Sequence, residues 1–220
     1  MILTPSRQLS RIALFLDGNY FYNVSNYYKF QHARGKRLSI VGLQHFVRAE
    51  VADRLNVDQG SSQIVEAHYF RGRYSAYSAD EASKLKDDRI FDDVLTKAGV
   101  IQHYTLLDEG GPTIQEKGID VWLALEAYDL AVHNRYDILC LVAGDGDYVP
   151  LIRKLNGLGV RVLLLAWDLS YPQGDEGSRR QRDIRASAQL IDACSDPIMM
   201  NNLIEDRSRK DNILVNGLFY

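Results

Sequence analysis

Short apolar runs alternate along the chain with longer amphipathic stretches, a pattern typical of parallel strands joined by crossover helices. In the last two of these runs nearly every residue is apolar, as expected for central strands that helices cover on both faces. The pattern predicts five strands, at residues 12–16, 64–70, 100–106, 138–142 and 160–166.

Between the runs, apolar residues recur at three- and four-residue intervals, which is the spacing of an amphipathic helix. The stretch 119–133 is apolar on several sides, so we expect a deeply packed helix there. Residues 108–118 and 169–183 carry glycine and polar residues and are expected to form loops. Helices are predicted at 39–55, 80–98, 119–133 and 147–157, with one or two short helices within 184–206.

Five strands joined by crossovers make an α/β three-layer sandwich built on a five-stranded parallel sheet. We assign residues 1–195 to this domain and residues 196–220 to a helical or extended C-terminal tail. In open sheets of this kind the ligand site lies beyond the carboxyl ends of the strands, where the strand order reverses. The residues that follow each strand are therefore the first place to look for chemistry.

The composition is globular, because 46% of the 220 residues are hydrophobic and 25% are charged. No apolar run approaches the ~18 residues of a membrane helix, and the N-terminus lacks a secretory apolar region. Cys140 and Cys194 lack the spacing of a zinc site or a disulfide framework, so we expect both to be reduced and buried. These features predict a soluble, cytoplasmic protein that binds no membrane. The net charge of −3 excludes no nucleic acid, because bound cations can offset an acidic site.

Two of the predicted strands end in aspartate. The first is followed by Asp17-Gly18-Asn19, and the fourth by Ala143-Gly144-Asp145-Gly146-Asp147. If these two strands are neighbours, their ends lie about 5 Å apart. Carboxylates that close repel each other unless a proton or a cation lies between them, and hard oxygen ligands of this kind suit Mg²⁺ or Mn²⁺.

A third carboxylate, Asp120, stands at the start of the predicted helix 119–133. Helical spacing places it on one face with Ala124, Ala127 and Ala131, and small residues allow close packing against a neighbour. A carboxylate at the head of such a face reaches a helix cap, a partner or a metal. The pattern favours a functional role for Asp120.

Each of these residues also has a purely structural alternative. Asp-Gly after a strand is a common turn, so Asp17 could be a turn residue. Asp147 could cap the following helix, and Asp120 could simply favour the positive end of the helix dipole. Lys117, just before Asp120, could be an ordinary solvated lysine. The three acidic motifs are more persuasive together than singly.

The motifs at residues 12–19, 117–120 and 143–148 resemble those of the NYN domain, the LabA-like branch of the PIN-like nucleases, and the resemblance spans roughly residues 10–168. It implies the strand order 3-2-1-4-5, which places strands one and four side by side. It also implies a Mg²⁺-dependent ribonuclease. One departure is Ala143, where family members commonly carry serine.

By this resemblance, four carboxylates bind the metal and carry catalysis, namely Asp17, Asp120, Asp145 and Asp147. Asn19 is then an accessory polar residue and Lys117 a phosphate contact. Cleavage of this kind needs no serine, histidine or cysteine nucleophile, because metal-activated water attacks the phosphate. We interpret the five scattered histidines as structural or surface residues.

Substrate docking requires positive charge and stacking faces. Arg71, Arg73 and Tyr74 follow the second predicted strand, and Tyr20 follows the first motif, together with Tyr22. Arginine with aromatic residues suits single-stranded RNA. A further candidate cluster lies in the late loop, at Arg179, Arg180 and Arg182, and solvated surface arginine is the alternative for both groups.

Two other functions compete with the ribonuclease. An aspartate-based phosphatase of the haloacid-dehalogenase type has a second aspartate two residues after the first, where this chain has Asn19. A non-catalytic regulatory or RNA-binding module would keep the fold without turnover. The sequence leaves open which RNA is bound, whether cleavage is endo- or exonucleolytic, whether the protein forms a homo-oligomer, and what the tail does.

Overall fold

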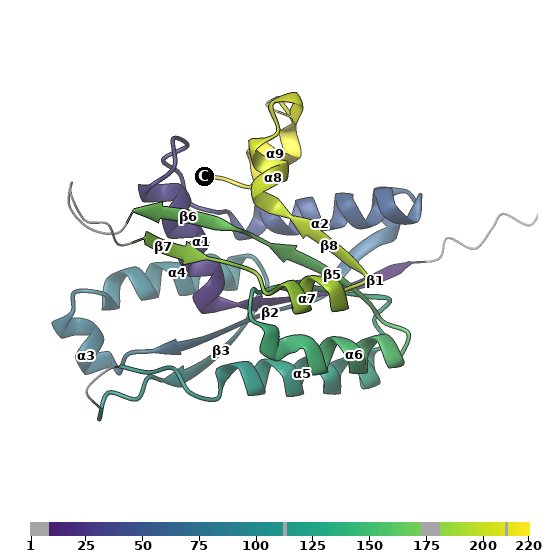
Figure 1. Ribbon diagram of the computed structural model, residues 1–220. Helices are drawn as coiled ribbons and strands as arrows, with labels where there is room; N and C mark the ends of the chain where they lie inside the picture. Colours follow the sequence, from purple (N-terminus) through teal and green to yellow (C-terminus); the bar gives the residue numbers. More distant parts are fainter. Residues whose placement is uncertain (1–8, 112–113, 173–180, 210) are drawn as a thin grey trace, which may run out of the picture.

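A computed structural model describes residues 9–111, 114–172, 181–209 and 211–220 of the chain. Its centre is a six-stranded, fully parallel sheet of order β3-β2-β1-β4-β5-β8 (Figure 1). The predicted order 3-2-1-4-5 is confirmed. The strands are β1 Ser10–Asp17, β2 Ser62–Arg73, β3 Ile101–Leu106, β4 Ile138–Val142, β5 Arg161–Ala166 and β8 Asp196–Met199.

The predicted count of five strands is wrong, because β8 adds a sixth at the edge beside β5. This strand is only four residues long, and the sequence reading placed its residues among short helices or at the tail boundary. Its Pro197 lacks a backbone donor, which an edge strand tolerates. Four residues are too few to show a strand period in the sequence.

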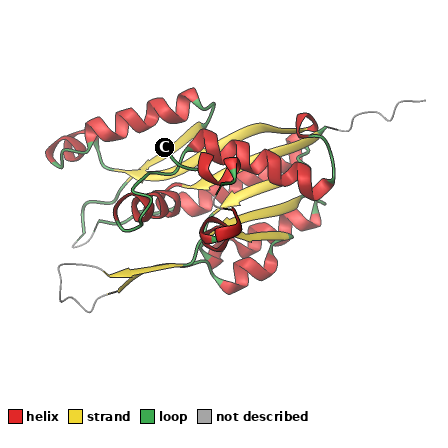
Figure 2. Ribbon diagram, turned by 90° about the horizontal axis from the view of Figure 1, so that it is seen from above, coloured by secondary structure: helices red, strands yellow, loops and turns green. Residues whose placement is uncertain are grey.

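Helices cover both faces of the sheet (Figures 1 and 2). Two short helical turns, η1 Gln59–Ser61 and η2 Gly146–Tyr148, precede β2 and α6, and a third, η3 Arg207–Arg209, follows α8. The helices are α1 Gly18–Phe30, α2 Ile40–Leu55, α3 Ala76–Glu81, α4 Leu85–Lys97, α5 Ile119–Asn134, α6 Val149–Gly157, α7 Ala188–Ala193, α8 Met200–Glu205 and α9 Ile213–Gly217.

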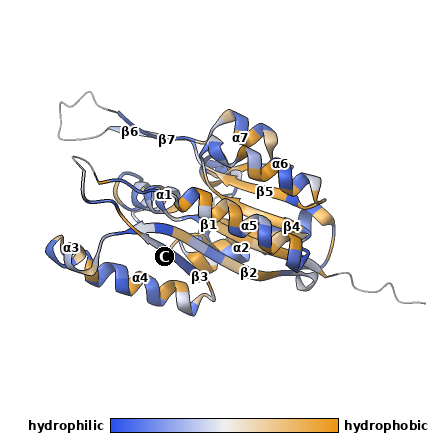
Figure 3. Ribbon diagram, turned by 90° about the horizontal axis from the view of Figure 1, so that it is seen from below, coloured by the Kyte–Doolittle hydropathy of each residue, from blue (hydrophilic) through white to orange (hydrophobic). Residues whose placement is uncertain are grey.

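Alternation along the strands produces two hydrophobic cores. In β1, Ile12, Leu14 and Leu16 pack with α1, α2 and α4, while Ala13 and Phe15 pack with α5, α6 and α7. All five residues of β4 are buried, as the continuous apolar run predicted. The central strands are accordingly orange, the colour of hydrophobic residues, in Figure 3. The predicted three-layer arrangement is therefore confirmed.

No helix is predicted from the sequence at residues 18–30, but they form helix α1 directly after β1. This segment is crowded with tyrosine, phenylalanine and asparagine, which have modest helix propensity. The helix is started by Asp17, whose carboxylate accepts a hydrogen bond from the Tyr20 N–H at 3.0 Å. The aspartate that resembled a turn residue is thus a helix cap.

Two helix predictions need correction. The helix predicted at 80–98 is divided into α3 and α4 by a turn in which Ser83 has a φ of 55°. Helix α5 is not deeply packed, because Val121 and Leu125 are 63% and 65% exposed. Only the face with Leu123 and Ala127 is buried against the sheet, and the opposite face is exposed despite its apolar residues.

The predicted loop 169–183 contains an antiparallel pair, β6 Leu169–Pro172 and β7 Gln181–Ile184. This hairpin lies against α1, where Arg182 Nη2 donates a hydrogen bond to Asn23 Oδ1 at 3.0 Å (Figure 1). Arg182 is therefore held on the protein surface. Arg179 and Arg180 of the same predicted cluster lie outside the described residues.

The last residues of the chain pack on the same face as α1 and α2. Val215 and Leu218 are buried in that core, and Phe219 pairs with Leu38 in an isolated bridge. Gly42 in α2 has no room for a Cβ, which would stand 1.9 Å from the Gly217 carbonyl oxygen. The domain boundary at 195 stays a prediction, although residues on both sides of it share this core.

Candidate metal and nucleic-acid site

Two aspartates meet at the carboxyl edge of the sheet around one hydroxyl group. Asp17 ends β1, Asp120 lies in the first turn of α5, and Tyr148 lies in η2 after β4. The Tyr148 hydroxyl donates a hydrogen bond to Asp120 Oδ1 at 2.8 Å, and it lies 3.5 Å from Asp17 Oδ2. Helix α5 packs against β1 and so brings Asp120 to Asp17, while the adjacency of β1 and β4, which the resemblance implied, brings Tyr148 to both.

Asp17 lies in a buried and acidic environment. Burial, together with smaller contributions from Asp120 and Glu116, raises the pKa of Asp17 to about 7, against the hydrogen bond from the Tyr20 N–H. Burial and the charges of Asp17 and Asp120 also raise the pKa of Tyr148 far above its usual value, so the Tyr148 hydroxyl stays neutral and donates a hydrogen bond. A cation between the carboxylates would relieve their repulsion.

Glu116 and Tyr148 belong to this cluster and were assigned no role from the sequence. Glu116 lies in the segment before α5, and the Gly72 N–H at the end of β2 donates a hydrogen bond to its Oε1. Its position next to Lys117 was the only available signal, and a loop residue cannot be placed without the fold. Tyr148 stands directly after the last acidic motif, where its hydroxyl had no visible partner.

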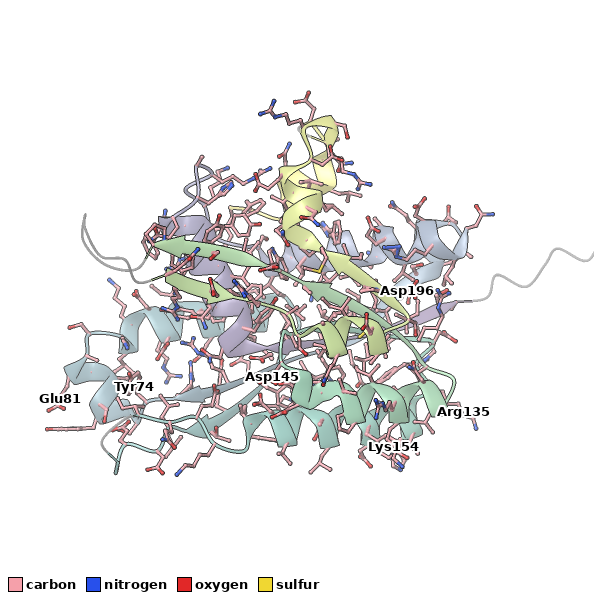
Figure 4. The ribbon with its side chains drawn as sticks, viewed as in Figure 1. Tyr74, Glu81, Arg135, Asp145, Lys154 and Asp196 are labelled. Atoms are coloured by element: carbon pink, nitrogen blue, oxygen red, sulfur yellow. The ribbon has the colours of Figure 1, made fainter. Side chains whose placement is uncertain are left out.

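Asp145 and Asp147 lie on the rim rather than between the other two carboxylates. Asp145 starts η2 by accepting a hydrogen bond from the Asp147 N–H at 2.9 Å, so the capping role considered for Asp147 belongs to Asp145. The charge of Asp145 contributes to raising the pKa of Tyr148, which places it on the same side of the sheet. Figure 4 shows Asp145 close to helices α5 and α6.

Within the described part of the chain, no three acidic, histidine or cysteine side chains converge closely enough to hold a metal ion as placed. Mg²⁺, however, is usually held by one or two carboxylates together with waters and substrate phosphates. The oxygens of Asp17 and Asp120, which both face the Tyr148 hydroxyl, fit that requirement. The donor set is therefore suited to Mg²⁺ or Mn²⁺.

Tyr20 links two elements next to the site. Its hydroxyl accepts from the Trp167 N–H at 2.7 Å and donates to the Trp167 carbonyl at 3.0 Å, joining α1 to the end of β5. Its ring also covers Gly144, where a Cβ would stand 2.5 Å from Tyr20 Cε2. The expected stacking role of Tyr20 stays a prediction, and these contacts favour a positioning role.

The basic residues expected to contact RNA differ in whether an acidic side chain already pairs with them. Arg73 is held by an ion pair with Asp92 at 2.6 Å, and Lys117 by an ion pair with Asp108. Arg71 lies over the ring of Tyr22, 4.1 Å from its centroid, and the ion pairs found in the described ranges do not include it. Tyr74 is covered by Lys84, 4.4 Å from its ring centroid, and lies beside α3 in Figure 4.

A cavity of about 620 Å³ opens beside the carboxylates, between α1, α4 and the end of β2. The cavity is lined by residues of both signs and by aromatic rings, among them Asn19, Tyr22, Arg71, Lys84, Phe91 and Glu116. Asn19, the expected accessory residue, thus faces the cavity, and its side-chain oxygen accepts from Asn23 at 3.4 Å. The site consists of a carboxylate edge and an adjoining cavity.

The parallel sheet of order 3-2-1-4-5, extended by β8 and flanked by helices, together with carboxylates at the ends of β1 and β4, is consistent with the PIN-like fold. The family model of the NYN domain matches residues 11–198, and the chain belongs to this family. NYN domains fall in the PIN-like nuclease superfamily, generally act on RNA, and usually depend on a divalent metal. Membership of the LabA-like branch stays a prediction.

Among solved structures, the chain is similar to a protein of unknown function from Vibrio parahaemolyticus, with a TM-score of 0.55 and 18% sequence identity. The likeness covers 89% of this chain and 96% of that one, and it shows the fold alone. No curated protein sequence matches the chain. Within the described ranges, none of the helices combines the length and apolar character that crossing a bilayer requires.

Proposed function

We propose that the protein is a Mg²⁺- or Mn²⁺-dependent ribonuclease that hydrolyses phosphodiester bonds of single-stranded RNA. The observation that supports this most directly is the pair of carboxylates, Asp17 and Asp120, around the Tyr148 hydroxyl at the carboxyl edge of β1 and β4. The negative charges of Asp120 and Glu116 contribute to raising the pKa of Asp17, which supports a cation at this edge. Membership of the NYN family adds weight to RNA as the substrate.

In this function, Asp17 and Asp120 hold the metal, and Tyr148 fixes the orientation of both carboxylates. A bound divalent cation supplies a lower pKa for the attacking water and offsets charge on the scissile phosphate. Asp145 and Asp147 are exposed at the rim, where they complete the metal site or accept the proton of the attacking water. The RNA strand approaches along Arg71, with Asn19, Lys117 and Tyr74 as further contacts.

The test is an incubation of labelled single-stranded RNA with Mg²⁺, Mn²⁺ or EDTA. We expect cleavage by the wild type with either cation, none in EDTA, and a loss of at least a hundredfold in Asp120→Asn. Asp129→Asn is the matched control, because Asp129 lies on the same helix but is 71% exposed. Equal cleavage by Asp120→Asn and Asp129→Asn would refute the assignment of the site.

A second candidate is a non-catalytic NYN module that binds RNA without cleaving it. It is favoured by the fact that no three potential ligands converge in the described residues. RNA binding without cleavage under any of the three conditions would select it.

Cys140 and Cys194 are free and buried, which fits our proposal that the protein acts in the reducing cytoplasm.

A further inference from the structure

The 620 Å³ cavity is large enough for a small ligand, since such sites typically span about 300–1,000 Å³. It adjoins the carboxylate edge, because Asn19 and Glu116 contribute to its lining. Asn19 follows Asp17 by two residues in the first turn of α1. The start of α1 also lies close to β2 here: a Cβ on Gly18 would stand 2.5 Å from the Phe70 carbonyl oxygen and 2.8 Å from Arg71 Cβ. A ligand in this cavity therefore lies next to the site of cleavage.

Arg71 gives the cavity a charge that is available to an anion. Its neighbour Arg73 is neutralised by Asp92, whereas within the described ranges no carboxylate lies at ion-pair distance from Arg71. Its side chain is partly buried, and its guanidinium is held in place by the Tyr22 ring. Asp88 and Glu116 also line the cavity, and Asp88 and Tyr69 act on the Arg71 guanidinium. A partly buried arginine that no described carboxylate pairs with directly can still bind phosphate, which matches the fork of its donors.

Tyr22 provides the second element, a stacking face. It is 38% exposed and lines the cavity, and Arg71 covers one side of its ring at 4.1 Å. Base–aromatic stacking next to a cation is how proteins bind unpaired nucleotides. A base inside a duplex could not reach this ring, because it would first have to leave its stack.

We propose that this cavity holds one unpaired nucleotide of the RNA strand, with its base stacked on Tyr22 and its phosphate bound by Arg71. The inference rests on the proposed function for the identity of the strand, and it adds the residues that select single-stranded RNA. The ring of Tyr22 contributes stacking, and the guanidinium of Arg71 contributes charge. Residue Arg73 contributes neither, because it is engaged inside the protein.

The experiment measures equilibrium binding of a fluorescent single-stranded oligouridylate by anisotropy in EDTA, where metal-dependent cleavage does not occur. Tyr22→Leu removes the ring and should weaken binding about tenfold, within the range for one stacked base. Tyr22→Phe keeps the ring and should bind as the wild type does. Tyr128→Leu is the matched control, because Tyr128 has the same 38% exposure but lies on α5, across the sheet.

Melting curves check that each variant is folded, and Tyr22→Gln replaces Tyr22→Leu if the latter is unstable. A duplex of the same sequence should bind the wild type and Tyr22→Leu alike. Unchanged binding of the single strand by a folded variant that lacks the ring, Tyr22→Leu or Tyr22→Gln, overturns the proposal. The proposal is also overturned if uridine monophosphate binds as tightly as the oligonucleotide, because the cavity would then be a site for a free nucleotide.

The two proposals fail separately. Binding that depends on Tyr22, together with no cleavage by the wild type under any metal condition, refutes the ribonuclease and keeps the nucleotide site. Metal-dependent cleavage, together with binding that ignores Tyr22→Leu and Tyr22→Gln, refutes the nucleotide site and keeps the ribonuclease.

Discussion

The hydroxyl of Tyr148 lies 2.8 Å from Asp120 Oδ1, although the two residues belong to different elements and are 28 positions apart in the chain. This contact fixes the start of α5 against the segment that follows β4. The same hydroxyl is 3.5 Å from Asp17, so one neutral donor stands between two acids that repel each other. In the metal-free protein, Tyr148 thus takes part of the role that a cation would have.

Replacing Tyr148 with phenylalanine should therefore leave the repulsion between the Asp17 and Asp120 carboxylates uncompensated. Tyr148→Phe keeps the buried ring but removes the hydrogen bond to Asp120, at a cost of about 1.5–3 kcal/mol of unfolding free energy in EDTA. Saturating Mg²⁺ should raise the melting temperature of the variant more than that of the wild type. Urea unfolding with and without Mg²⁺ measures both effects, and equal Mg²⁺ stabilisation of the two proteins would contradict the prediction.

The raised pKa of Asp17 predicts how stability depends on pH. A carboxyl whose folded pKa is raised from 3.8 to about 7 contributes full stability below pH 3.8, and that contribution is lost as the pH rises to about 7. Asp17→Asn cannot ionise, and its amide oxygen can still cap α1. In EDTA the variant should match the wild type near pH 4 and exceed it in stability above pH 7.

The gain from Asp17→Asn at pH 8 has an upper bound of about 4 kcal/mol, and partial solvent screening makes it smaller. Denaturant titrations across this pH range measure the difference. If Asp17→Asn is less stable than the wild type at pH 8, the ionised Asp17 carboxylate does not destabilise the metal-free protein, which contradicts the prediction.

Asp145 has a structural and a proposed catalytic role that can be separated. Asp145→Asn retains an oxygen that accepts from the Asp147 N–H, so its stability should stay within about 0.5 kcal/mol of the wild type. Asp145→Ala loses the cap and should cost about 1 kcal/mol. Both variants should lose metal-dependent cleavage, and full activity in Asp145→Asn would limit Asp145 to its role as a cap.

The sheet could be predicted because its first five strands are short, largely apolar runs that alternate regularly with amphipathic stretches. The predicted bounds of β4, residues 138–142, agree with the structure because every residue of the strand is buried. Helix α1 is not evident from the sequence, although its buried residues Phe21, Val24 and Tyr28 lie three and four residues apart, because exposed aromatic residues such as Tyr22 and Phe30 obscure the apolar face. Strand β8 was too short to be recognised.

The site could be predicted only where an acid follows a strand or starts a helix. Asp17 and Asp120 meet because α5 packs against β1, and Tyr148 joins them because β1 and β4 are neighbours, as the resemblance implied. Glu116 comes from an irregular segment whose path depends on Gly72, so no local pattern indicated it. The difference between Arg71 and Arg73 depends on Asp92, a residue of α4 that is distant from both in the sequence.

Arg71 and Arg73 were predicted to bind RNA together, and the structure leads us to expect opposite behaviour from them. The Arg73 guanidinium pairs with Asp92 and lies 3.7 Å from the Tyr104 ring centroid, so Arg73→Met should cost roughly 1–3 kcal/mol of stability. RNA affinity should stay unchanged, because that charge is already neutralised. Arg71→Met should keep most of the stability but bind single-stranded RNA more weakly.

Salt titration in EDTA distinguishes the two variants. Loss of one phosphate contact should make the log–log slope of affinity against salt shallower by about 0.7 for a single strand in Arg71→Met, and leave it unchanged in Arg73→Met. Arg153→Met is the control, because Arg153 is exposed on α6, on the other face of the sheet. If the slopes of Arg71→Met and Arg153→Met both equal that of the wild type, the phosphate contacts lie elsewhere on the protein. If Arg73→Met makes the slope shallower as well as Arg71→Met, the ion pair of Arg73 with Asp92 opens when RNA binds, and the two arginines act together.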